Sequence, residues 1–92
     1  MKAMPLKQAQ ARLYATAQRG QNAAVTVYTW KQDRWVEVTY KDDGRIILRE
    51  HGYRNETSTF DQAHQLKRAL KDACAREFPR SNKVHVSEHS KR

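Results

Sequence analysis

Apolar residues recur at spacings of three and four near the amino terminus, a pattern typical of a helix that buries one face. Pro5 suits the first helical position, and Gly20 suits the left-handed position that ends a helix. The sequence therefore predicts an amphipathic helix over residues 5–19. Its apolar positions are Leu6, Ala9, Leu13 and Ala17.

The period changes to two between Val25 and His51, which predicts strands. The four polar residues 31–34 suit a hairpin loop. Pairing of Trp30 with Trp35 across that loop then sets the register, because directly opposed residues share a face of the sheet. One face collects Val25, Val27, Val36, Val38 and Tyr40. The other face collects Thr26, Tyr28, Trp30, Trp35, Glu37 and Thr39.

The turn at residues 42–44 admits two registers, and charge decides between them. A two-residue turn places Arg49 opposite Val38, on the valine face. A three-residue loop with the glycine in the left-handed conformation places Leu48 opposite Val38 instead. It also sets Glu37 opposite Arg49, a favourable cross-strand pair. We therefore predict the three-residue loop.

A polar connector is expected over residues 52–58, followed by a second helix. The cap of this helix is either Thr59 with Gln62 or Ser58 with Asp61. Its apolar stripe comprises Ala63, Leu66, Leu70, Ala73, Cys74 and Phe78.

Pro79 ends the second helix. Residues 83–87 alternate again, with Val84 and Val86 on one side, and this favours a short fourth strand. Residues 88–92 are expected to fray.

These elements predict an α+β fold in the order α-β-β-β-α. It is a three-stranded antiparallel meander with two helices packed on one face, with or without the short strand at the carboxyl end. The 92 residues suit a single domain, 1–92, with an ordered core over about 5–87 and a frayed tail over 88–92.

Composition narrows the class of protein. Cys74 is the only cysteine, which excludes an intrachain disulfide and fits a reducing compartment. The apolar runs are too short to span a bilayer or to form a secretory signal. We therefore expect a cytoplasmic protein.

The formal net charge of +8 is unevenly distributed. It amounts to +4 over residues 1–30, zero over 31–60 and +4 over 61–92. The excess therefore lies on the two helices and the tails, where it can attract phosphate backbones or simply remain solvated. The candidate nucleic-acid-binding residues are Arg12, Arg19, Lys67, Arg68, Lys71 and Arg76.

The aromatic outer face of the sheet is the second candidate surface. It offers an anchor for a protein partner, a platform on which bases stack, or a cross-strand pair that only stabilises the hairpin. Its candidate partner-binding residues are Tyr28, Trp30, Trp35, Lys31 and Arg34.

Catalysis and metal binding find little support in the sequence. The residues His85-Val86-Ser87-Glu88-His89 match a zinc-peptidase pattern, but that chemistry needs a helix and the segment alternates like a strand. Cys74 lies on an apolar stripe, with no histidine placed beside it. The acidic residues, including Glu37 and Glu50, do not indicate a shielded cleft that tunes a carboxyl pKa. We expect no enzyme activity, no metal and no cofactor.

The α-β-β-β-α order over residues 5–78 resembles that of the double-stranded RNA-binding domain. That family begins its second helix with a lysine-rich motif, where this chain has Thr59-Phe60-Asp61-Gln62-Ala63. Its first hairpin loop carries a Gly-Pro-x-His element, where this chain has Lys31-Gln32-Asp33-Arg34. The resemblance is one of order alone, and membership is not inferred from it.

The sequence therefore predicts a small basic binding protein, a regulator that acts through protein–protein contact. The partner is another protein or a second copy of the chain. Nucleic acid bound by the basic helices and the aromatic face is the alternative.

Overall fold

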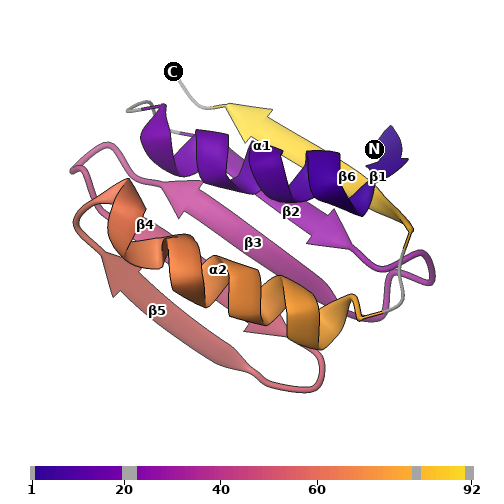
Figure 1. Cartoon of the computed structure of the whole chain (residues 1–92). Helices are drawn as coiled ribbons and strands as arrows, with labels where there is room; N and C mark the ends of the chain where they lie inside the picture. Colours follow the sequence, from indigo (N-terminus) through magenta and orange to yellow (C-terminus); the bar gives the residue numbers. More distant parts are fainter. Residues whose placement is uncertain (1, 20–22, 80–81, 91–92) are drawn as a thin grey trace.

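The computed structural model describes residues 2–19, 23–79 and 82–90. They form a six-stranded antiparallel sheet with both helices on one face, as Figure 1 shows. The elements in chain order are β1 Lys2–Pro5, α1 Leu6–Gln18, β2 Ala23–Tyr28, β3 Trp35–Tyr40, β4 Ile46–His51, β5 Glu56–Phe60, α2 Ala63–Glu77 and β6 Lys83–Ser90. The expected helix stop at Gly20 lies outside the described residues.

The prediction of a three-stranded meander is wrong. Strands β2, β3 and β4 do form a meander, but the full strand order is β1-β6-β2-β3-β4-β5. The order of elements is therefore β-α-β-β-β-β-α-β, and the likeness to the double-stranded RNA-binding domain does not extend to this fold.

Strand β5 occupies the segment that the sequence predicts as a polar connector. It pairs with β4 alone and forms one edge of the sheet, and Phe60 is its one apolar side chain. Most of its side chains are exposed, so no apolar alternation marks it in the sequence. Polar and β-branched residues suit such a short edge strand.

Strand β6 lies inside the sheet, between β1 and β2. It extends to Ser90, so it takes in residues 88–90, which the sequence assigns to the tail. Val84 and Val86 are buried beneath the helices. The edge strand β1 pairs with the first half of β6, a contact between the two ends of the chain that local patterning does not encode.

The faces of the meander are as predicted, although one register differs. Val25 pairs with Val38 and Val27 with Val36, and all four side chains are buried. Strand β2 ends at Tyr28, which pairs with Trp35, so the predicted pair of Trp30 with Trp35 is wrong.

The difference has a local cause in the loop. The loop spans six residues, 29–34, and the Thr29 side chain donates a hydrogen bond to Asp33 at 2.7 Å. The amide of Thr29 also donates to the carbonyl of Arg34. The register shift is two residues, so no side chain changes face.

The register of β3 and β4 confirms the three-residue loop. Val38 pairs with Leu48 and Glu37 with Arg49. Gly44 has a φ of 90°, which glycine adopts without the steric cost that a side chain would bring.

Helix α2 begins later than predicted, because Ser58 and Thr59 belong to β5. Gln62 is the cap, and its side chain and that of Gln65 form a reciprocal capping box. Both helices lay their apolar stripes on the valine face. The buried apolar residues are Met4, Ala9, Leu13, Ala17, Ala23, Val25, Val27, Val36, Val38, Ile46, Leu48, Leu66, Leu70, Ala73, Cys74, Phe78, Val84 and Val86.

Within the described part of the chain, no helix has the length and apolarity needed to cross a membrane. The cytoplasmic location stays a prediction.

Candidate functional site

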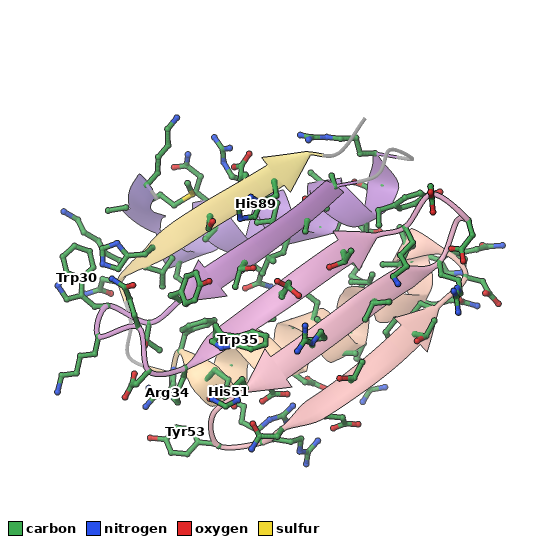
Figure 2. The ribbon with its side chains drawn as sticks, turned by 180° about the vertical axis from the view of Figure 1, so that it is seen from behind. Trp30, Arg34, Trp35, His51, Tyr53 and His89 are labelled. Carbon is green, nitrogen blue, oxygen red and sulfur yellow. The ribbon has the colours of Figure 1, made fainter. Side chains whose placement is uncertain are left out.

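Ring-bearing side chains form one row across the outer face of the sheet. Cross-strand pairing sets His85 beside Tyr28, Tyr28 beside Trp35, and Trp35 beside His51. The four residues lie on the consecutive strands β6, β2, β3 and β4, which are spaced about 4.8 Å apart. We call these four residues the aromatic row. Figure 2 views this face, which carries no helix.

Trp30 extends the aromatic row at its β6 end. It lies in the β2–β3 loop, is 56% exposed, and stacks on His85 with ring centroids 4.3 Å apart. At the other end, Trp35 and His51 stack with centroids 5.3 Å apart. The guanidinium of Arg49 lies 5.3 Å from the Trp35 ring centroid, a cation–π distance. Stacked pairs of rings therefore lie at both ends of the aromatic row, and Tyr28 lies between them on β2.

The structure brings three of the five predicted partner-binding residues together. Tyr28 and Trp35 belong to the aromatic row, and Trp30 stacks against its end. Lys31 is exposed in the adjoining loop.

Arg34 lies apart from the aromatic row and makes structural contacts. Its guanidinium donates hydrogen bonds to the main-chain carbonyl of Glu77 at 3.3 and 3.2 Å and lies 3.4 Å from the Glu77 carboxylate. It also covers the ring of Tyr53, 4.6 Å from its centroid (Figure 2). Arg34 therefore joins the β2–β3 loop to the end of α2.

Sequence reasoning missed His51 and His85 as members of this surface. His85 alternates with Val84 and Val86, which was a signal that it faces away from the core. Its neighbours on the outer face were not predictable, because they depend on β6 pairing with β2.

Polar side chains next to the aromatic row neutralise one another. Glu37 accepts a hydrogen bond from the Thr26 hydroxyl at 2.7 Å and lies 3.5 Å from the Arg49 guanidinium. The strands of this face therefore carry little net charge at this point.

The predicted nucleic-acid-binding residues lie on the opposite side of the sheet, and two are neutralised. Arg12 forms an ion pair with Glu88, and Arg76 forms a bidentate pair with Glu50 at 2.7 and 2.6 Å. Arg19 is exposed just beyond the end of α1. The other three, Lys67, Arg68 and Lys71, are exposed on α2.

A groove of about 340 Å³ runs between the two helices. From α1 it is lined by Lys7, Gln10, Ala11 and Tyr14, and from α2 by Lys67, Leu70 and Lys71. Lysines therefore lie on both of its rims.

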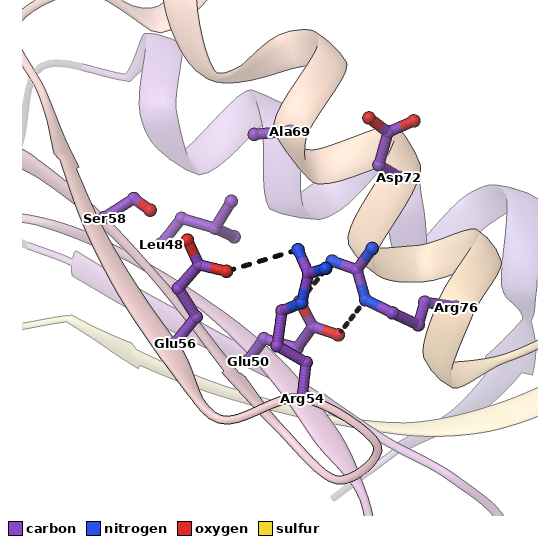
Figure 3. Close-up of a pocket in the computed structure, with 8 residues that line it drawn as sticks. All are labelled: Leu48, Glu50, Arg54, Glu56, Ser58, Ala69, Asp72 and Arg76. Atoms are coloured by element: carbon purple, nitrogen blue, oxygen red, sulfur yellow. Dashed lines mark hydrogen bonds and ion pairs between the residues drawn. The ribbon is translucent and has the colours of Figure 1, made fainter.

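A smaller pocket of about 150 Å³ lies between α2 and the strands β4 and β5 (Figure 3). Inside it, Arg76 binds Glu50, and Arg54 lies 3.4 Å from Glu56. Burial acts to raise the pKa of Glu50, but hydrogen bonds, first of all from Arg76, outweigh burial and hold that pKa below its usual value.

Glu77, a neighbour of Glu50, is fully buried. Its carboxylate accepts hydrogen bonds from the backbone amides of Tyr53 at 3.1 Å and Arg54 at 3.3 Å. Burial, and then the neighbouring Glu50, raises the pKa of Glu77. The expectation that no sheltered carboxyl is tuned is therefore wrong for Glu50, and the sequence makes no prediction for Glu77. Both carboxylates accept hydrogen bonds from other groups of the protein, so this pair has a structural role.

The structure does not bring the remaining sequence candidates together. Cys74 is buried, and burial with the nearby Glu50 raises the pKa of its thiol to about 12. His85 and His89 are four residues apart on a strand, which separates them by about 13 Å. Among the described residues, no group of three or more histidine, cysteine, aspartate and glutamate side chains has the arrangement to hold a metal ion.

Neither a comparison with protein-family profiles nor one with curated proteins finds a match for this chain.

Proposed function

We propose that this chain is a non-enzymatic binding protein that makes a protein–protein contact through its open sheet face, with a second copy as the partner. The aromatic row carries the proposal. Tryptophan and tyrosine are the residues that most often anchor protein interfaces. Here they lie side by side with stacked histidines on a face that no helix covers.

The size of the open face supports a stable dimer. The protein measures 34 by 23 Å along its two longer axes, so the open face of each copy offers at most about 800 Å², the area that one partner contributes to a standard interface. Burial of such a face on both partners matches a standard protein interface. Two sheets packed face to face about a two-fold axis are a common way to cover two such faces.

The charge distribution also favours this arrangement. Glu37 and Arg49 offset each other beside the aromatic row, so the contacting faces are close to neutral there. The basic helices of the two copies lie on the outside, separated by both sheets. That separation exceeds the Debye length of about 8 Å at physiological ionic strength. A net charge of +8 on each chain therefore does not oppose the dimer strongly.

The same geometry disfavours a nucleic acid held jointly by the aromatic face and the basic helices. These two surfaces lie on opposite sides of the sheet. One short segment of a nucleic-acid chain cannot contact both surfaces at once. The cation nearest Trp35, Arg49, already has Glu37 as a partner.

Sedimentation equilibrium over a range of protein concentrations tests the proposal. We expect a species of twice the 10.8 kDa chain mass. Trp35→Ala and Thr39→Lys, both on the outer face, should each yield monomers with an unchanged far-UV circular dichroism spectrum. Tyr53→Ala removes a ring that is 70% exposed in the β4–β5 loop, and it should leave the dimer intact. A wild-type chain that stays monomeric at all concentrations contradicts the proposal.

A further inference from the structure

The groove between α1 and α2 combines an apolar floor with basic rims. Leu70 and the ring of Tyr14 contribute to the floor. Lys7 on α1 and Lys67 and Lys71 on α2 line its sides. We propose that this groove binds single-stranded nucleic acid, with the three lysines on the phosphates and Tyr14 against a base.

The lysines are available to an anionic ligand. Among the ion pairs found in the described part of the chain, none involves Lys7, Lys67 or Lys71. Lys67 and Lys71 lie one helical turn apart, about 6 Å along the axis. They point to the same side of α2, as residues i and i+4 do.

Few acidic groups oppose them. Helix α1 contains no acidic residue, and of the two in α2, Glu77 is fully buried. The other, Asp72, is exposed and lines a second hollow with His64, Lys67, Arg68 and Lys71. Arg68 therefore extends the basic track beyond the groove along α2.

The floor of the groove selects a ligand that carries rings as well as charge. Tyr14 is half-buried, and the ammonium of Lys67 lies 5.7 Å from its ring centroid. An aromatic ring with a cation beside it is the arrangement on which bases of single strands stack. A duplex keeps its bases stacked inside and offers this ring only its backbone.

A membrane surface fits this face less well. The large apolar side chains that are exposed in the described residues are Trp30 and Tyr53, and neither lies on a helix. A helix face that inserts into a bilayer needs apolar anchors flanked by lysine and arginine. The helix face of this protein has the cations without the anchors.

The test is fluorescence anisotropy with a labelled twelve-nucleotide oligouridine and with a matched duplex, in low salt. We expect the wild-type protein to bind the single strand more tightly than the duplex. The double variant Lys67→Ala/Lys71→Ala should weaken binding at least tenfold and reduce the slope of log affinity against log salt by about 1.4. The control variant Lys31→Ala/Lys41→Ala removes the same charge from exposed loops and should change affinity less than threefold.

Tyr14→Leu separates base recognition from simple charge attraction. This variant should weaken oligouridine binding several-fold and leave the affinity for inorganic polyphosphate, measured by competition, unchanged. Its circular dichroism spectrum should match that of the wild type. No binding of the single strand in low salt overturns the proposal. Equal affinity for the duplex, equal effects of the two lysine variants, or no effect of Tyr14→Leu also overturns it.

The groove and the sheet face are tested independently. The monomeric Thr39→Lys variant should retain its affinity for oligouridine per chain, since Thr39 lies on the opposite side of the sheet. A protein that fails to dimerise can therefore still bind nucleic acid in this groove, and the reverse also holds.

Discussion

The guanidinium of Arg34 lies 3.4 Å from the carboxylate of Glu77, although the two residues are 43 positions apart. Arg34 closes the β2–β3 loop, and Glu77 ends α2. The same carboxylate holds the backbone amides of Tyr53 and Arg54 in the β4–β5 loop. One buried side chain thus joins two loops to the end of a helix.

Arg34→Ala should lower the free energy of unfolding by about 2–4 kcal/mol, because it leaves the buried Glu77 carboxylate without its cation. The helix end also loses the hydrogen bonds that Arg34 donates to the Glu77 carbonyl. Urea denaturation measures this loss. Lys31→Ala, in the same loop but exposed, should stay within about 0.5 kcal/mol of wild type. Equal losses in the two variants would show that Arg34 has no special role.

Gly52→Ala should destabilise the protein more than Gly44→Ala does. A Cβ at position 52 would lie 2.3 Å from the Glu77 carboxylate and 2.7 Å from Arg34, and its φ is 150°. Position 44 also has a positive φ, of 90°, but nothing lies within 4 Å of the added carbon. Gly44→Ala therefore carries only the conformational cost, on the order of 1 kcal/mol. Thermal unfolding of the two variants tests this ranking, and a larger loss at position 44 would contradict it.

Stability should reach a maximum in the mildly acidic range. The raised pKa of Glu77 means that the folded chain binds this proton more tightly than the unfolded chain, so protonation of Glu77 stabilises the fold as pH falls. The lowered pKa of Glu50 has the opposite effect. Its contribution is lost as pH falls below the ordinary glutamate value of about 4.3.

Melting temperatures between neutral pH and about pH 3.5 measure both effects. Glu77 faces Glu50 and Arg34, so Arg34 limits the size of the rise on acidification. In Glu77→Gln the rise in melting temperature on acidification should disappear, while the loss of stability at low pH remains. Glu56→Gln alters an exposed carboxylate and should retain the wild-type profile. A rise that persists in Glu77→Gln would assign it to another group.

Cys74 should resist thiol reagents in the folded protein. Its side chain is 2% exposed, and burial raises its pKa to about 12, so thiolate is scarce at pH 8. Ellman's reagent should react with it slowly in buffer and rapidly in concentrated urea. Fast reaction of the folded chain would mean that α2 opens readily.

Removal of residues 83–92 should unfold the protein. Without β6, β1 loses the strand with which it pairs, and β2 becomes an exposed edge. The truncation also deletes the buried Val84 and Val86. The amide spectrum in two-dimensional NMR should collapse to the narrow range of an unfolded chain. A control that lacks only residues 91–92 should keep a dispersed spectrum.

Local patterning predicted the parts of the fold that depend on near neighbours. The apolar spacing around Leu13 and Leu66 gave two helices on the valine face, and both side chains are fully buried. The charge pair of Glu37 with Arg49 identified the loop between β3 and β4, since these residues are joined by a short connection. The alternation of Val84 and Val86 indicated a strand without indicating its neighbours.

The aromatic row was predicted only in part, because the pattern of a strand does not indicate all of its neighbours. Tyr28 and Trp35 were placed on the outer face because alternation decides the face of a strand residue. Arg34 was predicted to bind a partner, but its guanidinium binds Glu77 instead. Nothing local in the sequence links the β2–β3 loop to the end of α2. His85 joins the aromatic row through the pairing of β6 with β2, which no local pattern indicates. His51 lies opposite Trp35 in the register that the three-residue loop already sets.

By itself, the sequence determined the two helices, the strands β2, β3 and β4, and the side of each of these strands that meets the core, because these depend on periods of a few residues. The tertiary structure decided that β6 lies between β1 and β2, that β5 forms an edge, and that the aromatic row and the basic helices lie on opposite sides of the sheet. Those outcomes depend on backbone hydrogen bonds between segments far apart in the chain. Backbone groups are alike in nearly all residues, so side-chain patterns do not specify which strands they join.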